Sequence, residues 1–228
     1  MQDASPRLSR TIWIGVALVV LLMAFAFLLS GLKGRQRASH VRPTGSGAED
    51  LATTGQIADF TLTNQANQPV KLADLRGKVW VADIIFSRCA GPCPRMTRQM
   101  ASLQAALPKD SSARLVTLTT DPDFDTPEVL ARYAKRFNAE TNRWWFLTGD
   151  KKEIAALATE GLKLTGFLET KPEDRLNPAD LFIHSTLFVI VDKQARLRGV
   201  IETDSDSGSW TNLQAELVET IRTLEREK

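Results

Sequence analysis

An uncharged stretch of 21 residues near the N-terminus most constrains how this chain of 228 residues can fold. It spans residues 12–32, lies between Arg10 and Lys33, and reads IWIGVALVVLLMAFAFLLSGL. A helix of this length crosses the hydrocarbon core of a bilayer. A secretory signal peptide would have a shorter apolar core and a small-x-small cleavage site, which the segment lacks. We therefore expect an uncleaved transmembrane anchor at residues 12–32, preceded by a short tail at residues 1–11.

The charges around this segment and the chemistry of the remaining chain favour opposite orientations. Two basic residues precede the segment and four follow it before residue 43. Because basic flanks stay in the cytoplasm, charge alone would keep the rest of the chain there. Long domains, however, cross a membrane largely regardless of flanking charge. We expect a single-pass membrane protein whose domain is extracytoplasmic, on the periplasmic side in a bacterium, because the thiol chemistry described below suits that compartment.

The rest of the chain reads as a linker followed by one soluble domain. Residues 33–50 include the small and polar run PTGSG, which is typical of a flexible tether. Six of the 29 basic and two of the 27 acidic residues precede Asp50, which leaves 23 basic and 25 acidic residues from Asp50 onward. Residues 51–228 are thus nearly neutral, which argues against nucleic acid as a partner. A domain of this size can bury a full core.

Strand and helix patterns alternate along residues 51–228. The apolar run 79–86 is typical of a central strand that is buried on both faces. The other elements that the sequence predicts are a hairpin at 60–63 and 69–72, helices at 94–107, from 126, at 150–159 and from 211, strands at 115–119 and 144–147, and a hairpin at 187–191 and 197–202. Because helical crossovers join parallel strands, we expect an α/β domain with a mainly parallel central sheet flanked by helices.

Cys89 and Cys93 are the only cysteines, and they lie where the strand at 79–86 gives way to the helix at 94–107. Such a pair can bind a soft metal, cycle as a dithiol or close a small disulfide. A purely structural disulfide is disfavoured because so short a loop loses little chain entropy. Backbone amides at a helix N-terminus stabilise a thiolate, and Arg88 adds a positive charge. Residues four apart share a helix face, so we expect both sulfurs to point at one ion.

The ligand inventory favours copper over zinc. Thiolate sulfur selects Cu(I), and imidazole also suits copper, whereas structural zinc usually needs four protein ligands. The chain has two histidines, of which His40 lies in the linker and His184 lies before a predicted strand. A three-coordinate copper site of Cys89, Cys93 and His184 fits this inventory. A hydrogen-bonded structural histidine is the alternative interpretation of His184.

Three motifs in this order resemble the Sco/SenC family. They are the cysteine pair followed by Pro94, the sequence DPDFDTP at residues 121–127, and the sequence HST at residues 184–186 before a strand that ends in Asp192. The resemblance covers about residues 57–224 and the anchor. It implies a membrane-anchored, thioredoxin-like copper protein of cytochrome c oxidase assembly.

The resemblance also implies roles for individual residues. Cys89, Cys93 and His184 match the copper ligands, which would hold one ion as Cu(I), Cu(II) or both. Asp121 and Asp125 match an acidic loop that supports the site or docks a partner. Capping of the following helix is the alternative interpretation of Asp125, and one residue can serve both roles.

Three positions depart from the family pattern. Ala90 stands where proline usually follows the first cysteine, Arg88 replaces an aromatic or neutral polar residue, and Ala195 replaces a hairpin glycine. These changes could alter the loop and its copper affinity, which would leave a thiol reductase.

We expect a metallochaperone rather than an enzyme. It would deliver copper to an extracytoplasmic cuproenzyme, first of all the dinuclear copper site of cytochrome c oxidase subunit II. Another copper chaperone or a thiol reductase would be a further partner. The alternative is a membrane-anchored thiol-disulfide oxidoreductase in which one of Cys89 and Cys93 attacks a partner disulfide and the other resolves it. A peroxidase is disfavoured because no Pro-x-x-x-Thr-x-x-Cys arrangement surrounds Cys89, and a scaffold with incidental cysteines is disfavoured further.

Overall fold

The computed structural model describes residues 55–164, 170–171, 173, 181–182, 185–204 and 209–227, with Met23 and the backbone of residues 41–42. The chain divides into two compact units, Met1–Ser39 and His40–Lys228, and all described residues except Met23 belong to the second. The predicted tail, the anchor at 12–32 apart from Met23, and most of the linker lie outside the described residues. Within the described residues, no helix combines the length and the hydropathy that a bilayer span requires.

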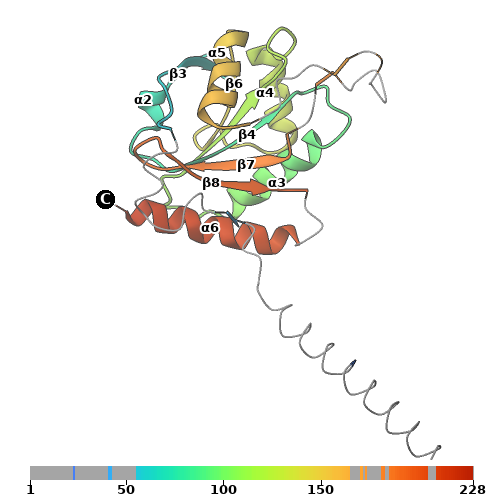
Figure 1. Cartoon of the computed structure of the whole chain (residues 1–228). Coiled ribbons are helices and arrows are strands. Elements are labelled where there is room, and N and C mark those ends of the chain that lie inside the picture. Colours follow the sequence, from blue (N-terminus) through green and yellow to red (C-terminus); the bar gives the residue numbers. More distant parts are fainter. Residues whose placement is uncertain are drawn as a thin grey trace, which may run out of the picture. The chain divides into compact units, whose positions relative to one another are not determined.

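The second unit is built on one sheet of eight described strands, which Figure 1 shows with helices on both of its faces. From one edge to the other the strands are β1 (Val41–Arg42), β8 (Leu197–Glu202), β7 (Leu187–Val191), β4 (Trp80–Ile85), β5 (Arg114–Thr119), β6 (Trp144–Thr148), β2 (Thr61–Asn64) and β3 (Pro69–Lys71). The predicted strands and both predicted hairpins are confirmed. β4 and β5 are the two central strands of the sheet. The segment that follows β4 therefore leaves from the middle of the sheet and not from an edge strand.

The sheet is mixed, so the prediction of a mainly parallel sheet is wrong. Only the pairs β4 with β5 and β5 with β6 are parallel, and the other described pairs are antiparallel. The two parallel pairs are those joined by helical crossovers, as the sequence argument required. The hairpins β2–β3 and β7–β8 then extend this parallel core with antiparallel strands on either side.

Helices cover the two faces of the sheet. The helical segments are α2 (Leu72–Leu75), α3 (Cys93–Ala106), α4 (Pro127–Arg136), α5 (Lys151–Ala156), the π-helical turn η2 (Leu157–Gly161) and α6 (Trp210–Arg226). Apolar residues of α3, α4 and α6 form one core cluster with the sheet, and those of α2, α5 and η2 form the other. The cysteine pair belongs to the first cluster.

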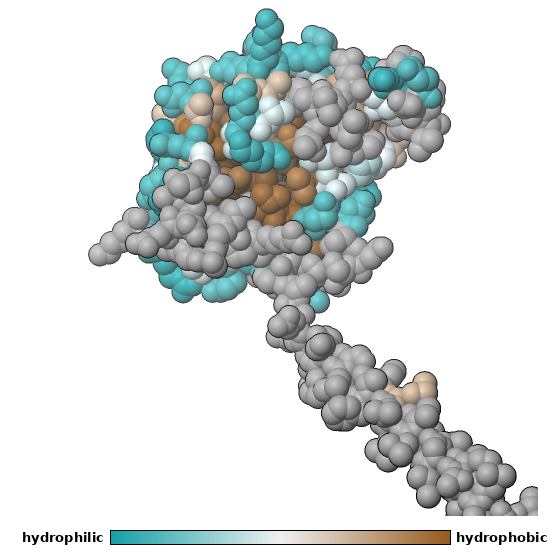
Figure 2. Space-filling model, viewed as in Figure 1, coloured by the Kyte–Doolittle hydropathy of each residue, from teal (hydrophilic) through white to brown (hydrophobic). Residues whose placement is uncertain are grey.

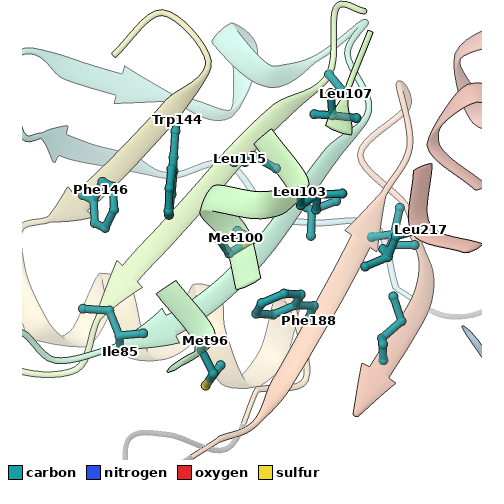
Figure 3. Packing of buried hydrophobic residues seen from close by; sticks show 14 of the residues in the cluster. Ile85, Met96, Met100, Leu103, Leu107, Leu115, Trp144, Phe146, Phe188 and Leu217 are labelled. Atoms are coloured by element: carbon teal, nitrogen blue, oxygen red, sulfur yellow. The ribbon is translucent and has the colours of Figure 1, made fainter. Parts of the chain in front are cut away.

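Alternation along β4 divides its side chains between these clusters, and every residue of the strand is buried. Met96 and Met100 of α3 have no exposed surface and pack with Leu103, Leu115 and Phe188 in the first cluster (Figure 3). The two methionines are therefore core residues.

Outside these cores, the face seen in Figure 2 is mostly hydrophilic around a smaller hydrophobic area.

Ala195 in the β7–β8 turn has a left-handed backbone, with φ of 62°. Its backbone amide donates a 3.0 Å hydrogen bond to Asp192 O, and its carbonyl accepts one of 2.9 Å from Ile57 N. These bonds hold an L-residue in a conformation that glycine adopts without steric cost.

Candidate metal centre

The two cysteines lie on either side of the start of α3. β4 ends at Ile85, and the Cys89 amide donates a 3.1 Å hydrogen bond to Phe86 O, which closes a turn. Cys93 is the first residue of α3, so Cys89 precedes the helix. The expectation that both sulfurs lie on one helical face is therefore wrong. The turn at residues 86–92 brings them together instead.

Neither cysteine is in a disulfide, and both thiols are buried and in contact. The exposed fractions of Cys89 and Cys93 are 6% and 3%. The Cys93 thiol forms a side-chain hydrogen bond with Cys89, and the Gly91 amide donates a 3.3 Å hydrogen bond to Cys89 Sγ. Two sulfur atoms are thus presented together beneath a short exposed loop, since Ala90 and Gly91 are exposed.

The environment of Cys93 keeps this thiol protonated. The hydrogen bond with Cys89 raises the pKa of Cys93 far above its ordinary value, and burial and the charge of Cys89 raise it further. A hydrogen bond with the backbone of Phe86 only partly opposes these effects on the pKa. The expected thiolate stabilisation at the helix N-terminus is therefore outweighed for Cys93 by burial next to a second thiol.

The guanidinium of Arg88 contacts the loop after β5. Its Nη2 lies 2.5 Å from Asp121 Oδ2, and its Cζ lies 4.0 Å from the ring centroid of Phe124. The prediction that Arg88 adds a positive charge next to Cys89 is therefore incomplete, because the Asp121 carboxylate binds its guanidinium. Asp121 and Phe124 thus lie against the segment that carries Cys89.

Asp125, in the same loop, is hydrogen-bonded to Ser87 in the segment that carries Cys89. It is fully buried, and its carboxylate accepts hydrogen bonds from Ser87 N at 3.0 Å, from Ser87 Oγ and from Thr119 Oγ1 at 2.5 Å. Burial, the largest influence, raises the pKa of Asp125, and the bonds from Ser87 and Thr119 oppose this. The cap of α4 is Thr126, which accepts from the Val129 amide. Helix capping is therefore the wrong interpretation of Asp125.

His184 lies outside the described residues, so its role as a ligand stays a prediction. Its described neighbours are both buried: Phe182 is 6% exposed and Ser185 is 5% exposed. The ring of Phe182 packs edge-on against Phe86, with 5.2 Å between the centroids. The segment before the histidine therefore contacts the turn that leads to Cys89.

Sequence reasoning missed Asp83, the single charged residue in β4. It is fully buried, and its Oδ1 accepts a 2.6 Å hydrogen bond from Thr117 Oγ1, which in turn accepts one of 2.9 Å from Trp144 Nε1. Its Oδ2 has no hydrogen-bond partner. Burial raises the pKa of Asp83 to about 7. An acidic residue within an otherwise apolar run was the signal that could have revealed it.

The described residues alone supply two soft donors. No group of three or more His, Cys, Asp or Glu side chains that could hold a metal occurs among them. The arrangement can therefore bind an ion that accepts two sulfurs, with a third ligand from residues not described, or it can close a disulfide. A four-ligand site is not formed by the described residues.

The sequence is similar to a known protein family over most of its length. The sequence model of the SCO1/SenC family matches residues 49–219, a range that contains both cysteines, His184 and both loop aspartates. The SCO1 protein homolog of Bacillus subtilis is 33% identical over 62% of this chain and 71% of its own length. A Stutzerimonas stutzeri protein described as copper-binding is 28% identical over 64% of this chain and 68% of its own length.

Among solved structures, BsSco superposes with a TM-score of 0.62 at 27% identity, over 77% of this chain and 96% of that chain. BsSco is described as a member of the Sco family of cytochrome c oxidase assembly proteins, and its structure identified a disulfide switch. The fold expected from the three sequence motifs, a thioredoxin-like Sco fold, is thereby confirmed.

Proposed function

Because the chain belongs to the SCO1/SenC family, we propose that it is a copper carrier rather than an enzyme. It binds one copper ion through Cys89 and Cys93 and delivers that ion to a copper enzyme outside the cytoplasm. The observation that carries this proposal is the pair of buried cysteines that contact each other, without a disulfide between them, where β4 meets α3.

The donor chemistry supports copper as the cargo. Thiolate sulfur is a soft ligand that suits Cu(I), as well as zinc and iron–sulfur clusters. The described residues lack the four ligands of a structural zinc site. His184 is proposed as the third ligand, supported by the contact of Phe182 with Phe86. The Stutzerimonas stutzeri relative, which is described as copper-binding, favours the same cargo.

Copper binding must displace a proton from Cys93. Because contact with Cys89 and burial raise the pKa of Cys93, its thiol is protonated in the metal-free state. Affinity for copper therefore rises with pH, since a metal competes with protons for the sulfur. A site of only two or three ligands also leaves room for a ligand of the receiving protein, so transfer can proceed by ligand exchange.

The proposed client is the dinuclear copper site of cytochrome c oxidase subunit II. The assignment of BsSco to a family of cytochrome c oxidase assembly proteins supports this choice. Another copper chaperone that loads the chain, or a thiol reductase that keeps Cys89 and Cys93 reduced, is the proposed second partner.

Thiol-disulfide exchange is the second candidate function, favoured by the contact between the two thiols. The Cys89 thiolate would attack a partner disulfide, forming a mixed disulfide and releasing one partner thiolate. Cys93, after losing its proton, would attack Cys89 Sγ and release the second partner thiolate. The partner gains two electrons and this chain ends as the Cys89–Cys93 disulfide. The disulfide switch identified in BsSco favours such a closure.

We propose that residues 12–32 anchor the domain, through the linker at residues 33–50, on the extracytoplasmic side. Alkaline phosphatase fused after Lys228 tests the orientation, because this enzyme is active only where its disulfides form. High phosphatase activity is expected. An inactive enzyme in a well-expressed fusion would place the domain in the cytoplasm and remove the oxidase as a client.

Two parallel reactions separate the two candidate functions. In the first, the copper-loaded full chain in detergent is mixed with the reduced, copper-free soluble domain of subunit II from the same organism. In the second, the reduced, metal-free chain is mixed with the disulfide form of that domain. A copper carrier moves copper in the first reaction. Thiol reduction in the second reaction without copper transfer in the first would assign the chain to the reductases.

A further inference from the structure

Arg88 forms two contacts with the loop after β5, and both fix the position of its guanidinium. Nη2 lies 2.5 Å from Asp121 Oδ2, and Cζ lies 4.0 Å from the centroid of the Phe124 ring. Among the described residues of the second unit, Phe124 is the only large hydrophobic side chain that is exposed, at 41%. The guanidinium therefore stacks on an aromatic face at the surface and binds a carboxylate beneath it.

The Asp121 carboxylate needs this cation. The side chain of Asp121 is 11% exposed, whereas that of Arg88 is 43% exposed. Breaking an ion pair by removing one partner leaves the other charge uncompensated, and this costs more where that charge is largely buried. The pair thus cancels a negative charge that would otherwise lie in a poorly solvated position.

The cancelled charge lies against the segment that carries Cys89. Arg88 directly precedes Cys89 in the sequence. The backbone amide of Thr120, the neighbour of Asp121, donates a 2.9 Å hydrogen bond to Ile85 O at the end of β4. Asp125, four residues further on, binds Ser87. Both ends of the acidic loop are therefore attached to the segment that carries Cys89.

We propose that Arg88 is a positioning residue that neutralises Asp121 and thereby favours Cu(I) over Cu(II) at the cysteine pair. This inference rests on the proposed copper function. Two thiolates with Cu(I) carry a net charge of −1, and with Cu(II) they carry no net charge. An uncompensated carboxylate close by would favour the more positive ion, and Arg88 removes that bias.

The test compares Cu(I) and Cu(II) affinities of the full chain in detergent, each measured by competition with a chelator specific for that oxidation state. The variants are Arg88→Gln, Asp121→Asn, the double variant and Arg88→Lys. Arg88→Gln should raise the ratio of Cu(II) to Cu(I) affinity on the order of tenfold, which is the effect of one unit charge at several ångströms in a partly solvated site. Asp121→Asn should lower the ratio, because it leaves the guanidinium charge uncompensated.

The remaining two variants distinguish an effect of the Arg88 charge from an effect of loop geometry. The double variant should return near the ratio of the unmodified chain, and Arg88→Lys should stay close to it because the positive charge remains. A role in loop geometry alone would make all four variants shift the ratio in the same direction or leave it unchanged, and either result overturns the inference. Should Arg88→Gln fail to fold, the test still stands on the other variants, because Asp121→Asn should lower the ratio whereas Arg88→Lys should leave it unchanged.

Failure of the proposed function has a different signature. If the unmodified chain binds neither Cu(I) nor Cu(II), the copper function and this inference fall together. If it binds copper and the four ratios lie within twofold of one another, only the role of Arg88 is wrong.

Discussion

Asp125 accepts a 3.0 Å hydrogen bond from the backbone amide of Ser87, although 38 residues separate the two in the chain. The same carboxylate also accepts from the hydroxyls of Ser87 and Thr119. All three groups donate in these bonds, so both carboxylate oxygens act as acceptors. This buried carboxylate therefore fixes the turn that presents Cys89.

Asp125→Asn should destabilise the domain by about 1–3 kcal/mol, because one of the two buried acceptor oxygens becomes an NH₂ group and a neutral amide accepts a weaker hydrogen bond than a carboxylate. Urea unfolding of the metal-free, reduced unit His40–Lys228 measures this. Thr126→Ala is the matched control and should cost about 1 kcal/mol as a lost helix cap, without altering copper affinity. A loss of only a few tenths for Asp125→Asn would mean that its bonds to Ser87 and Thr119 contribute little.

Asp83→Asn should change how stability depends on pH. Burial raises the pKa of Asp83 from 3.8 to about 7, so the folded chain retains a proton that the unfolded chain releases. The stability associated with this proton is fully present below about pH 4 and is lost as the pH rises through about 7. Asparagine resembles the protonated acid and does not titrate. Its free energy of unfolding should therefore improve relative to the unmodified chain by up to about 1.4 kcal/mol per pH unit between pH 4 and 7.

Urea unfolding at pH 5 and pH 8, with both thiols reduced, checks this. Asp110→Asn removes an exposed carboxylate and controls for the general loss of a negative charge. Parallel pH profiles for the unmodified chain and Asp83→Asn would show that Asp83 is ionised throughout this range, against our account.

Ala195→Gly should stabilise the domain by about 0.5–1 kcal/mol. Ala195 has φ of 62°, a left-handed conformation that costs an L-residue about 1 kcal/mol and glycine much less. The gain is reduced because glycine has more freedom in the unfolded chain. Thermal unfolding of both forms measures it, and a lower midpoint for the glycine variant would show that the packing of the buried Ala195 methyl group outweighs the backbone strain.

His184→Ala should weaken Cu(II) binding more than Cu(I) binding. Two thiolates satisfy the low coordination number that Cu(I) accepts, whereas Cu(II) prefers additional ligands that include nitrogen. Separate titrations with the two ions measure both losses. Equal losses, or none, would make His184 a structural histidine.

The elements of the fold follow from local patterns, whereas their order in the sheet does not. The strand within residues 79–86 and the helix after it are predictable because a continuous apolar run and apolar residues at helical spacing are patterns within a short stretch of sequence. The antiparallel position of β7 beside β4 is set by packing between distant segments, so the prediction of a mainly parallel sheet failed.

Some features of the candidate site are likewise predictable from nearby residues, whereas others depend on contacts between distant segments. The close spacing of Cys89 and Cys93 predicts their contact, and Thr126 with Pro127 predicts the start of α4. The pairs Arg88 with Asp121 and Asp83 with Thr117 join residues more than 30 apart in sequence. Such pairs depend on the register of β4 with β5, which no local pattern contains.

Copper content of the reduced chain tests the central claim most directly. The full chain in detergent is loaded with Cu(I), freed of excess metal and analysed for copper per chain, beside the double variant Cys89→Ser with Cys93→Ser. We predict one copper ion per unmodified chain and none in the double variant, because serine oxygen is a poor ligand for this soft ion. Equal copper content in the two proteins would contradict the assignment of the cysteine pair as the copper site.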